Sequence, residues 1–268
     1  MKTSSVQEKS RGILLFAFNT SEIDYVEIAR RSARLVTHTL NLPVTLVTEQ
    51  GTSADGFDQV IYIDNTLQNY KIGERGAWRN GDRWQAYNLS PYDETILIDS
   101  DYLVLDQNLL KLFEQDFDYR IMTHNDKPAG AWALNMGLFG LQYLWATVIL
   151  FRKTSRAGML FDLVGRIQRN YHYYSRLYHM RDRNFRNDYA FTIADNILNG
   201  YQPGEQGIPW SMLTFADVVT SITEKDDLLT IKETEKGYVI PRQNIHVMDK
   251  GYLLSDDFAD FVEAICAN

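Results

Sequence analysis

Three short apolar runs near the start of the chain, with a helical pattern between the first two, restrict the possible folds more than any other feature of the sequence. The runs Gly12–Phe18, Pro43–Thr48 and Val60–Ile63 have the apolar, β-branched composition of buried strands. Between the first two, apolar and small residues recur at spacings of three and four, as on one helix face: Tyr25, Ile28, Ala29, Ser32, Leu35 and Thr39. We expect Ser21 to cap this helix. Strand, helix and strand at this spacing predict a βαβ unit and a parallel sheet.

The stretch Thr95–Asp106, TILIDSDYLVLD, predicts a further buried strand that ends in two carboxylates. Asp99 and Asp101 are two residues apart, so on an extended backbone their side chains point the same way. Two carboxylates leave most of a cation's coordination sphere to other groups, which suits Mg²⁺ or Mn²⁺ shared with phosphates. The alternative is a simple strand-ending turn, where Asp and Ser are common. Ligands of parallel sheets bind beyond the carboxyl ends of the strands, where Asn19 also falls.

Length and composition indicate one globular domain. A chain of 268 residues, 45% of them apolar, can bury a large core, and it contains neither an internal repeat nor a low-complexity linker. The single Cys266 excludes an internal disulfide, and the polar N-terminus lacks a signal sequence, so we expect a reducing, cytoplasmic location. Ala131–Phe151 has no charge and is long enough to cross a membrane. Its glycines, Asn135 and Gln142 favour two buried strands joined by a turn instead.

Positive charge is concentrated in one segment of an acidic chain. The net charge of −8 argues against a general polyanion binder. Between Phe151 and Arg186, however, basic residues far outnumber acids: Arg152, Lys153, Arg156, Arg166, Arg169, Arg176, Arg181, Arg183 and Arg186. The regular spacing of apolar residues predicts one helix from Ser155 to about Tyr178. Arg166, Arg169, Tyr173 and Arg176 share its polar face.

The remaining elements are predicted from local patterns. A helix over Asp188–Leu198 is expected to end at Asn199-Gly200. Two strands, Leu228–Lys232 and Gly237–Ile240, are expected to pair. An amphipathic helix, Asp256–Cys266, is predicted at the C-terminus.

The segment Arg83–Leu105, RWQAYNLSPYDETILIDSDYLVL, resembles the corresponding segment of the glycogenin-like glycosyltransferases of the GT-A fold. In that family a basic residue opens a helix, a leucine-x-x-tyrosine turn follows, and the aspartate-x-aspartate arrives at the same separation. The resemblance implies a Rossmann-like α/β fold with a central, mostly parallel sheet flanked by helices. It also implies that residues 1–268 form one domain, with a nucleotide-sugar-binding half over 1–106 and an acceptor-binding half over 107–268.

The same resemblance assigns the site residues. Asp99 and Asp101 would hold a divalent metal, Mn²⁺ or Mg²⁺, on the donor diphosphate, and Arg83 would lie near the donor. His246 would be the third metal ligand and Lys250 a phosphate-binding lysine. Asn19 and Tyr25 correspond to the family's residues around the nucleotide base. Asp188, in Asn187-Asp188-Tyr189, corresponds to the family's carboxylate that contacts the transferred sugar or acts in catalysis.

The arginine-rich stretch that continues to Arg186 also resembles glycosyltransferases ascribed to large tailed phages, which would put the protein in the host cytoplasm. Arginines interleaved with aromatic residues suit a phosphate backbone and a displaced base. We therefore expect Arg166, Arg169 and Arg176 to bind the acceptor. The resulting hypothesis is metal-dependent transfer from a nucleotide sugar, with UDP as the expected nucleotide, to a hydroxymethylated pyrimidine in double-stranded DNA, whose base would be flipped out.

Alternatives to this hypothesis remain open at the sequence level. The acceptor would be a polysaccharide, a protein or a small molecule if the arginines form only a solvated helix face. A nucleotidyltransferase also uses paired carboxylates on a strand, whereas a nucleic-acid-binding module would use Asp99 and Asp101 only to end one. A P-loop enzyme is disfavoured because the chain lacks a glycine-rich phosphate loop.

Overall fold

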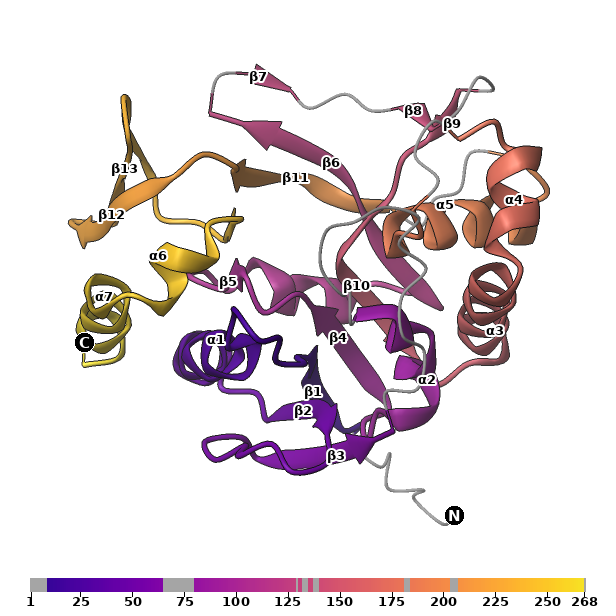
Figure 1. Ribbon diagram of the computed structural model, residues 1–268, viewed down its shortest axis with the longest axis horizontal. Helices are drawn as coiled ribbons and strands as arrows, with labels where there is room; N and C mark the ends of the chain where they lie inside the picture. The colour runs from indigo at the N-terminus through magenta and orange to yellow at the C-terminus, as the bar shows by residue number, and fades with distance from the viewer. Residues whose placement is uncertain are drawn as a thin grey trace, which may run out of the picture.

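A central ten-stranded sheet organises the part of the chain that the computed structural model describes (Figure 1). That part comprises residues 9–64, 80–128, 130–131, 135–136, 140–180, 184–202 and 207–267. The strand order is β3-β2-β1-β4-β10-β6-β11-β15-β5, with β7 paired to β6. The strands of this sheet are β1 (Arg11–Phe16), β2 (Val44–Glu49), β3 (Gln59–Ile63), β4 (Glu94–Ile98), β5 (Tyr102–Leu103), β6 (Tyr119–Lys127), β7 (Gly130–Ala131), β10 (Trp145–Arg152), β11 (Gly207–Phe215) and β15 (Ile245–Val247).

Parallel pairing dominates the sheet. Strand β1 runs parallel to β2 and β4, β2 to β3, and β11 to both β6 and β15. Strand β10 is antiparallel to its two neighbours, β4 and β6, and β5 is antiparallel to β15. The βαβ prediction for the N-terminal part is confirmed. So is the predicted fold class, an α/β fold with a central, mostly parallel sheet and flanking helices, as expected of the GT-A type.

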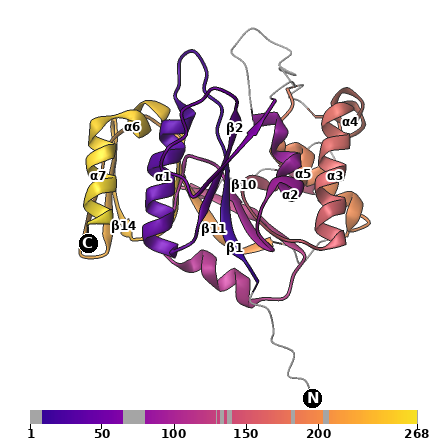
Figure 2. The same cartoon turned by 90° about the horizontal axis from the view of Figure 1, so that it is seen from below.

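Helices cover both faces of the sheet, as Figure 2 shows. On one side α1 (Tyr25–Leu40) lies beside the C-terminal helices α6 (Lys250–Leu254) and α7 (Asp256–Cys266). The other side carries α2 (Ala86–Leu89), α3 (Ser155–Arg169), α4 (Tyr171–Leu177) and α5 (Asn187–Leu198). The described residues also include two 3₁₀ helices, η1 (Asn80–Gln85) and η2 (Asn108–Glu114). None of the helices in the described ranges is long and apolar enough to cross a membrane.

Helix α1 begins later than the sequence suggests. The Asp24 carboxylate, rather than Ser21, accepts the Glu27 backbone N–H at 2.9 Å and caps the helix. Before it the chain makes a turn, in which the Thr20 hydroxyl accepts the Ile23 N–H at 3.0 Å. The expected N-cap at Ser21 is therefore wrong, because this turn delays the first helical residue to Tyr25.

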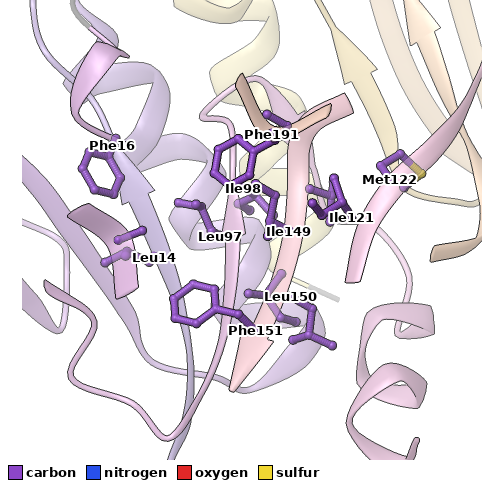
Figure 3. Close-up of a cluster of buried hydrophobic side chains, with 14 of the residues drawn as sticks. Leu14, Phe16, Leu97, Ile98, Ile121, Met122, Ile149, Leu150, Phe151 and Phe191 are labelled. Atoms are coloured by element: carbon purple, nitrogen blue, oxygen red, sulfur yellow. The ribbon is translucent and has the colours of Figure 1, made fainter. Parts of the chain in front are cut away.

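The core forms where β4 and β10 meet between the helices. Leu97 of β4 and Ile149 of β10 are register partners, and neither is accessible to solvent. Figure 3 shows them packed among apolar side chains from β1, β6 and α5, including Leu14, Ile121 and Phe191. The charge-free run Ala131–Phe151 therefore supplies one central buried strand, β10. The described part of its first half forms the short antiparallel pair β8 (Asn135–Met136) and β9 (Leu141–Gln142).

Two further expectations are modified, and two predicted helices are confirmed. The predicted long helix is broken at Asn170 into α3 and α4, and the Asn170 side chain donates back to the Arg166 carbonyl at 2.8 Å. The predicted strand pair belongs to a three-stranded sheet of β12 (Val219–Lys225), β13 (Leu228–Glu233) and β14 (Gly237–Pro241). Helices α5 and α7 are confirmed, and α5 is followed by Gly200 with a φ of 61°.

Candidate functional site

A tight turn follows β4 where the sequence suggests a continuing strand. The backbone N–H of Tyr102 donates to the Asp99 carbonyl at 3.1 Å, so the chain reverses between these residues. The expectation that Asp99 and Asp101 point the same way along an extended strand is therefore wrong. The alternative of a strand-ending turn describes the backbone correctly. The two carboxylates nevertheless lie at the carboxyl end of β4, and each has its own basic partner.

Asp101 is the centre of a buried ionic cluster. Its carboxylate oxygen Oδ2 accepts a hydrogen bond from the Lys250 ammonium. The same oxygen lies 3.3 Å from His246 Nε2. The backbone of the turn is fixed to β15, because the Val247 N–H donates to the Asp101 carbonyl at 3.0 Å. Asp101 is 8% and His246 7% exposed. Burial opposes the charged form, but Lys250 and His246 hold the pKa of Asp101 well below its ordinary value.

Asp99 is paired with a buried arginine. Arg83, on η1, is 1% exposed, and its Nη1 donates to the Asp99 carboxylate. Burial raises the pKa of Asp99; the Arg83 charge opposes this shift, and the Asp101 charge adds to it. The Nε and Nη2 atoms of Arg83 are buried and have no hydrogen-bond partner in the structure as described. Buried donors of a charged group are rarely left unpaired in proteins, so these two are candidates for hydrogen bonds to an anionic ligand.

Lys250 and Tyr25 lie on the α1 and α6 side of the cluster. The Lys250 ammonium also donates to the Met248 carbonyl at 3.0 Å. Burial would lower the pKa of Lys250, but Asp101 raises it above its ordinary value. Burial raises the pKa of Tyr25, and its hydroxyl is close enough to Lys250 and Asp101 to be affected by both charges.

Asn19 stabilises the start of helix α1. Its side-chain oxygen accepts the Val26 backbone N–H at 2.9 Å, which stabilises the first turn of α1. Asn19 follows β1 at the same end of the sheet as Asp99, as expected from parallel pairing. No contact between its side chain and the ionic cluster is found among the described residues.

Asp188 lies in the first turn of α5 and is firmly held. Its Oδ1 accepts the Ala146 backbone N–H of β10 at 2.8 Å, and its Oδ2 accepts Arg186 Nη2 at 3.1 Å. Burial and the Asp188 charge raise the pKa of Tyr143, so a third polar group lies against the same carboxylate. The charge of Asp188 in turn contributes to raising the pKa of Asp99. Asp188 is thus close to the Asp99 turn.

Two of the three predicted metal ligands are already adjacent. Two atoms bound at right angles to one cation, each about 2.1 Å from it, lie about 3 Å apart. The 3.3 Å between Asp101 Oδ2 and His246 Nε2 is close to this separation. Carboxylate oxygen and imidazole nitrogen also suit Mn²⁺. Asp99 faces Arg83 instead, and no group of three His, Cys, Asp or Glu residues within the described ranges is arranged to hold a metal. The Asp101–His246 pair therefore has the spacing of two ligands of one divalent cation, while Asp101 Oδ2 is bonded to the Lys250 ammonium in this structure.

The predicted acceptor arginines lie on the other helical layer. Arg166, Arg169 and Arg176 are exposed on α3 and α4, and no carboxylate in the described segments pairs with them. The Arg169 guanidinium lies 5.3 Å from the ring centroid of Trp84, the neighbour of Arg83. Helix α3 approaches this ring closely at Gly165, where an added Cβ would be 2.8 Å from it.

The basic segment presents less free charge than the sequence suggests. Arg152 binds Glu94 and three backbone carbonyls, and Lys153 donates to the Tyr87 carbonyl. Arg156 binds Asn199 at 2.5 Å, and Arg186 binds Asp188. The predicted contributions of Arg181 and Arg183 lie outside the described residues. Within the described part of this segment, the exposed arginines that pair with no carboxylate are therefore those of α3 and α4.

Several polar residues at the site have no recognisable sequence signal. Asn125 and Thr214 form a hydrogen-bonded chain to His246, and Tyr143 and Arg186 surround Asp188. These contacts depend on strand register and on helix placement across the fold. The sequence indicates only the contact between Arg186 and Asp188, because these two residues of opposite charge are two positions apart.

Comparison with known proteins gives only distant structural likenesses. No family model and no curated protein matches the chain. Among solved structures, the glycosyltransferase GlyE of Streptococcus pneumoniae TIGR4 is 13% identical, with a TM-score of 0.42, and the match covers 76% of this chain and 45% of GlyE. The chain thus spans less than half the length of GlyE.

Two other similar structures are matched over more of their length. The galactosyltransferase LgtC, solved with donor and acceptor sugar analogs, is 15% identical with a TM-score of 0.45, and 68% of this chain and 69% of LgtC are covered. Mouse xyloside xylosyltransferase 1 is 13% identical with a TM-score of 0.42, and 69% of this chain and 81% of that protein are covered.

Proposed function

We propose that the protein is a glycosyltransferase that takes a sugar from a nucleotide-diphosphate donor, with UDP as the nucleotide, in a reaction that depends on Mn²⁺ or Mg²⁺. The observation that carries this proposal is the buried Arg83 guanidinium, whose two unpaired donors lie at the same end of the sheet as the Asp101–His246 pair. A diphosphate would satisfy these donors, and a cation would satisfy the pair. Ligands of parallel sheets bind at this end.

The residues of the site have complementary tasks in this proposal. A bound Mn²⁺ or Mg²⁺ would neutralise the charge that grows on the leaving diphosphate. Asp101 and His246 would hold that ion. Arg83 would donate Nε and Nη2 to the diphosphate, and the Lys250 ammonium would add a second positive group beside it. Both halves of the proposed division, 1–106 and 107–268, would contribute to one site.

Asp188 and Tyr25 would act on the two other parts of the donor. Asp188 is oriented by the Ala146 N–H and by Arg186, so its carboxylate has a fixed direction close to Asp99. This fixed position supports a contact to the transferred sugar or a catalytic role. Tyr25 lies beside Lys250 and would contribute to the nucleotide side, together with Asn19.

The activity test is incubation with a panel of nucleotide sugars and Mn²⁺, followed by detection of slow donor hydrolysis. We expect one nucleotide sugar to be cleaved to its nucleoside diphosphate, with loss of the reaction in EDTA. Absence of hydrolysis for all donors, together with pyrophosphate release from a nucleoside triphosphate, would replace the proposal with a nucleotidyltransferase.

For the acceptor we propose double-stranded DNA carrying a hydroxymethylated pyrimidine. The support is the exposed set Arg166, Arg169 and Arg176, with Tyr173 exposed between them. This basic surface is joined to the donor side through Trp84, which contacts Arg169 and follows Arg83 in the chain. Arginines could bind phosphates while an aromatic residue contacts a base that is flipped out of the stack.

Neutralising Arg166, Arg169 or Arg176 singly should lower the slope of log affinity for DNA against log salt by roughly 0.9, because each arginine would neutralise one phosphate. Fluorescence anisotropy with hydroxymethylated and unmodified duplexes measures this slope. Arg34→Ala, an exposed arginine on α1 across the sheet, is the matched control and should leave the slope unchanged. No binding of either duplex at low salt would contradict a DNA acceptor.

A further inference from the structure

Three buried polar side chains on neighbouring parallel strands form a hydrogen-bonded chain that ends at Asp101. Asn125 of β6, Thr214 of β11 and His246 of β15 are 3%, 0% and 7% exposed, and Thr214 and His246 are register partners. Thr214 Oγ1 lies 2.6 Å from Asn125 Oδ1 and 3.2 Å from His246 Nδ1. The other ring nitrogen, Nε2, faces Asp101. Such a chain defines where the imidazole proton resides.

The short first contact gives the direction of donation. A separation of 2.6 Å is typical of O–H···O and is shorter than the usual N–H···O distance. The Thr214 hydroxyl therefore donates its single hydrogen to the Asn125 carbonyl oxygen. Toward His246 the hydroxyl oxygen is then left only as an acceptor. The imidazole must therefore carry a hydrogen on Nδ1 to complete this contact.

With the Nδ1 hydrogen directed at Thr214, Nε2 is the ring nitrogen that faces Asp101 Oδ2, 3.3 Å away. This contact helps to lower the pKa of Asp101, so in the metal-free protein it is an attractive contact with a proton between the two atoms. A divalent cation beside both atoms would take the place of that proton. The Lys250 ammonium on the same Asp101 oxygen provides positive charge at this place in the structure.

We propose that Thr214 and Asn125 are positioning residues that fix the Nδ1–H form of His246 and so make Nε2 a ligand for a divalent cation next to Asp101. This inference rests on the proposed function, which supplies the cation; the roles of Thr214 and Asn125 go beyond that function. The hydrogen bond made by one ring nitrogen sets which nitrogen binds a metal. Loss of such a supporting contact typically lowers metal affinity by about 10- to 100-fold.

The opposite arrangement is chemically defined and can be distinguished. If the Asn125 amide were reversed, its NH₂ would donate to Thr214, and Thr214 would donate to Nδ1. Nδ1 would then carry no hydrogen, and Nε2 would carry the ring hydrogen and donate it to Asp101. The 2.6 Å contact favours the first arrangement, whereas the Asn125 Nδ2 atom, which in that arrangement is buried without a hydrogen-bond partner among the described residues, is the observation that favours the second.

The first measurement determines the position of the imidazole proton in the unmodified protein. Nitrogen-15 NMR of the metal-free protein separates protonated from unprotonated imidazole nitrogens, and His246→Gln identifies the His246 signals among the five histidines. We expect Nδ1 of His246 to be protonated. A ring with an unprotonated Nδ1 would overturn the inference and leave the proposed function intact.

The second measurement reads metal affinity, by Mn²⁺ titration followed by electron paramagnetic resonance in the presence of UDP. We expect Thr214→Val to weaken Mn²⁺ binding by about 10- to 100-fold and Thr214→Ser, which keeps the hydroxyl, to restore it. Thr45→Val is the matched control, because Thr45 is equally buried and loses a 2.7 Å hydroxyl contact to Tyr92 away from the site.

The outcomes separate the two levels of the proposal. If Asp101→Asn abolishes Mn²⁺ binding while Thr214→Val binds as tightly as the unmodified protein, the positioning role is overturned and the metal site stands. If the unmodified protein binds no Mn²⁺ in the presence of UDP, the proposed metal-dependent function falls together with this inference.

Discussion

Asp101→Asn should lower the affinity for UDP in the presence of Mn²⁺ by more than about 100-fold. The substitution removes a buried carboxylate that pairs with Lys250 and lies against His246. A neutral amide would leave the Lys250 ammonium without its partner and provide a much weaker ligand. Isothermal calorimetry with UDP, with and without Mn²⁺, measures the effect.

A control for this prediction lies just before the other end of β4. Asp93→Asn changes an exposed carboxylate just before β4, at its opposite end, and should leave UDP binding unaltered. Breaking the buried pair is expected to lower the free energy of unfolding by about 3 kcal/mol, so the titration is performed well below the melting temperature of the variant. Equal UDP affinity in Asp101→Asn, Asp99→Asn and the unmodified protein would show that the turn after β4 is not part of a donor site.

Arg83→Met should weaken UDP binding by about 100-fold or more, both with and without Mn²⁺. The reason is the loss of the two unpaired donors, since a hydrogen bond to a charged group contributes about 1.5–3 kcal/mol and 1.4 kcal/mol corresponds to tenfold. Arg83→Lys keeps the charge but not the paired geometry, and should recover only part of the affinity. Calorimetry of UDP binding distinguishes the two variants.

The change at Arg83 also leaves Asp99 without its partner, so the double variant Arg83→Met/Asp99→Asn is the control for that effect. We expect the double variant to fold and to bind UDP as weakly as Arg83→Met. If Arg83→Lys and Arg83→Met both bind UDP like the unmodified protein, the unpaired guanidinium donors do not face the diphosphate, and the observation that carries the proposed function is lost.

The parts of the fold that sequence predicts well are those defined by local patterns. Apolar runs became β1, β2 and β4, and the spacing of apolar residues located α1 and α7, because burial of one face requires that spacing. Local patterns were less reliable where several polar residues compete for one turn. The cap of α1 fell on Asp24, and a break at Asn170 divided the expected long helix.

The site required information that no local pattern contains. Lys250 is 149 positions from Asp101, and the contact between them depends on how β15 is paired with β5 and β11. His246 and Lys250 were therefore identified only through the family resemblance. Thr214 was not identified at all, because its role depends on a strand register that brings it beside His246. Likewise, charge counting could not reveal that Arg152 is used inside the fold.

Anomalous diffraction from crystals grown with UDP and Mn²⁺ locates a bound cation independently of any activity. We expect one strong manganese peak beside Asp101 and His246, with the diphosphate of UDP between that peak and the Arg83 guanidinium. A UDP molecule bound at another place, or a manganese ion that contacts neither Asp101 nor His246, would contradict this expectation.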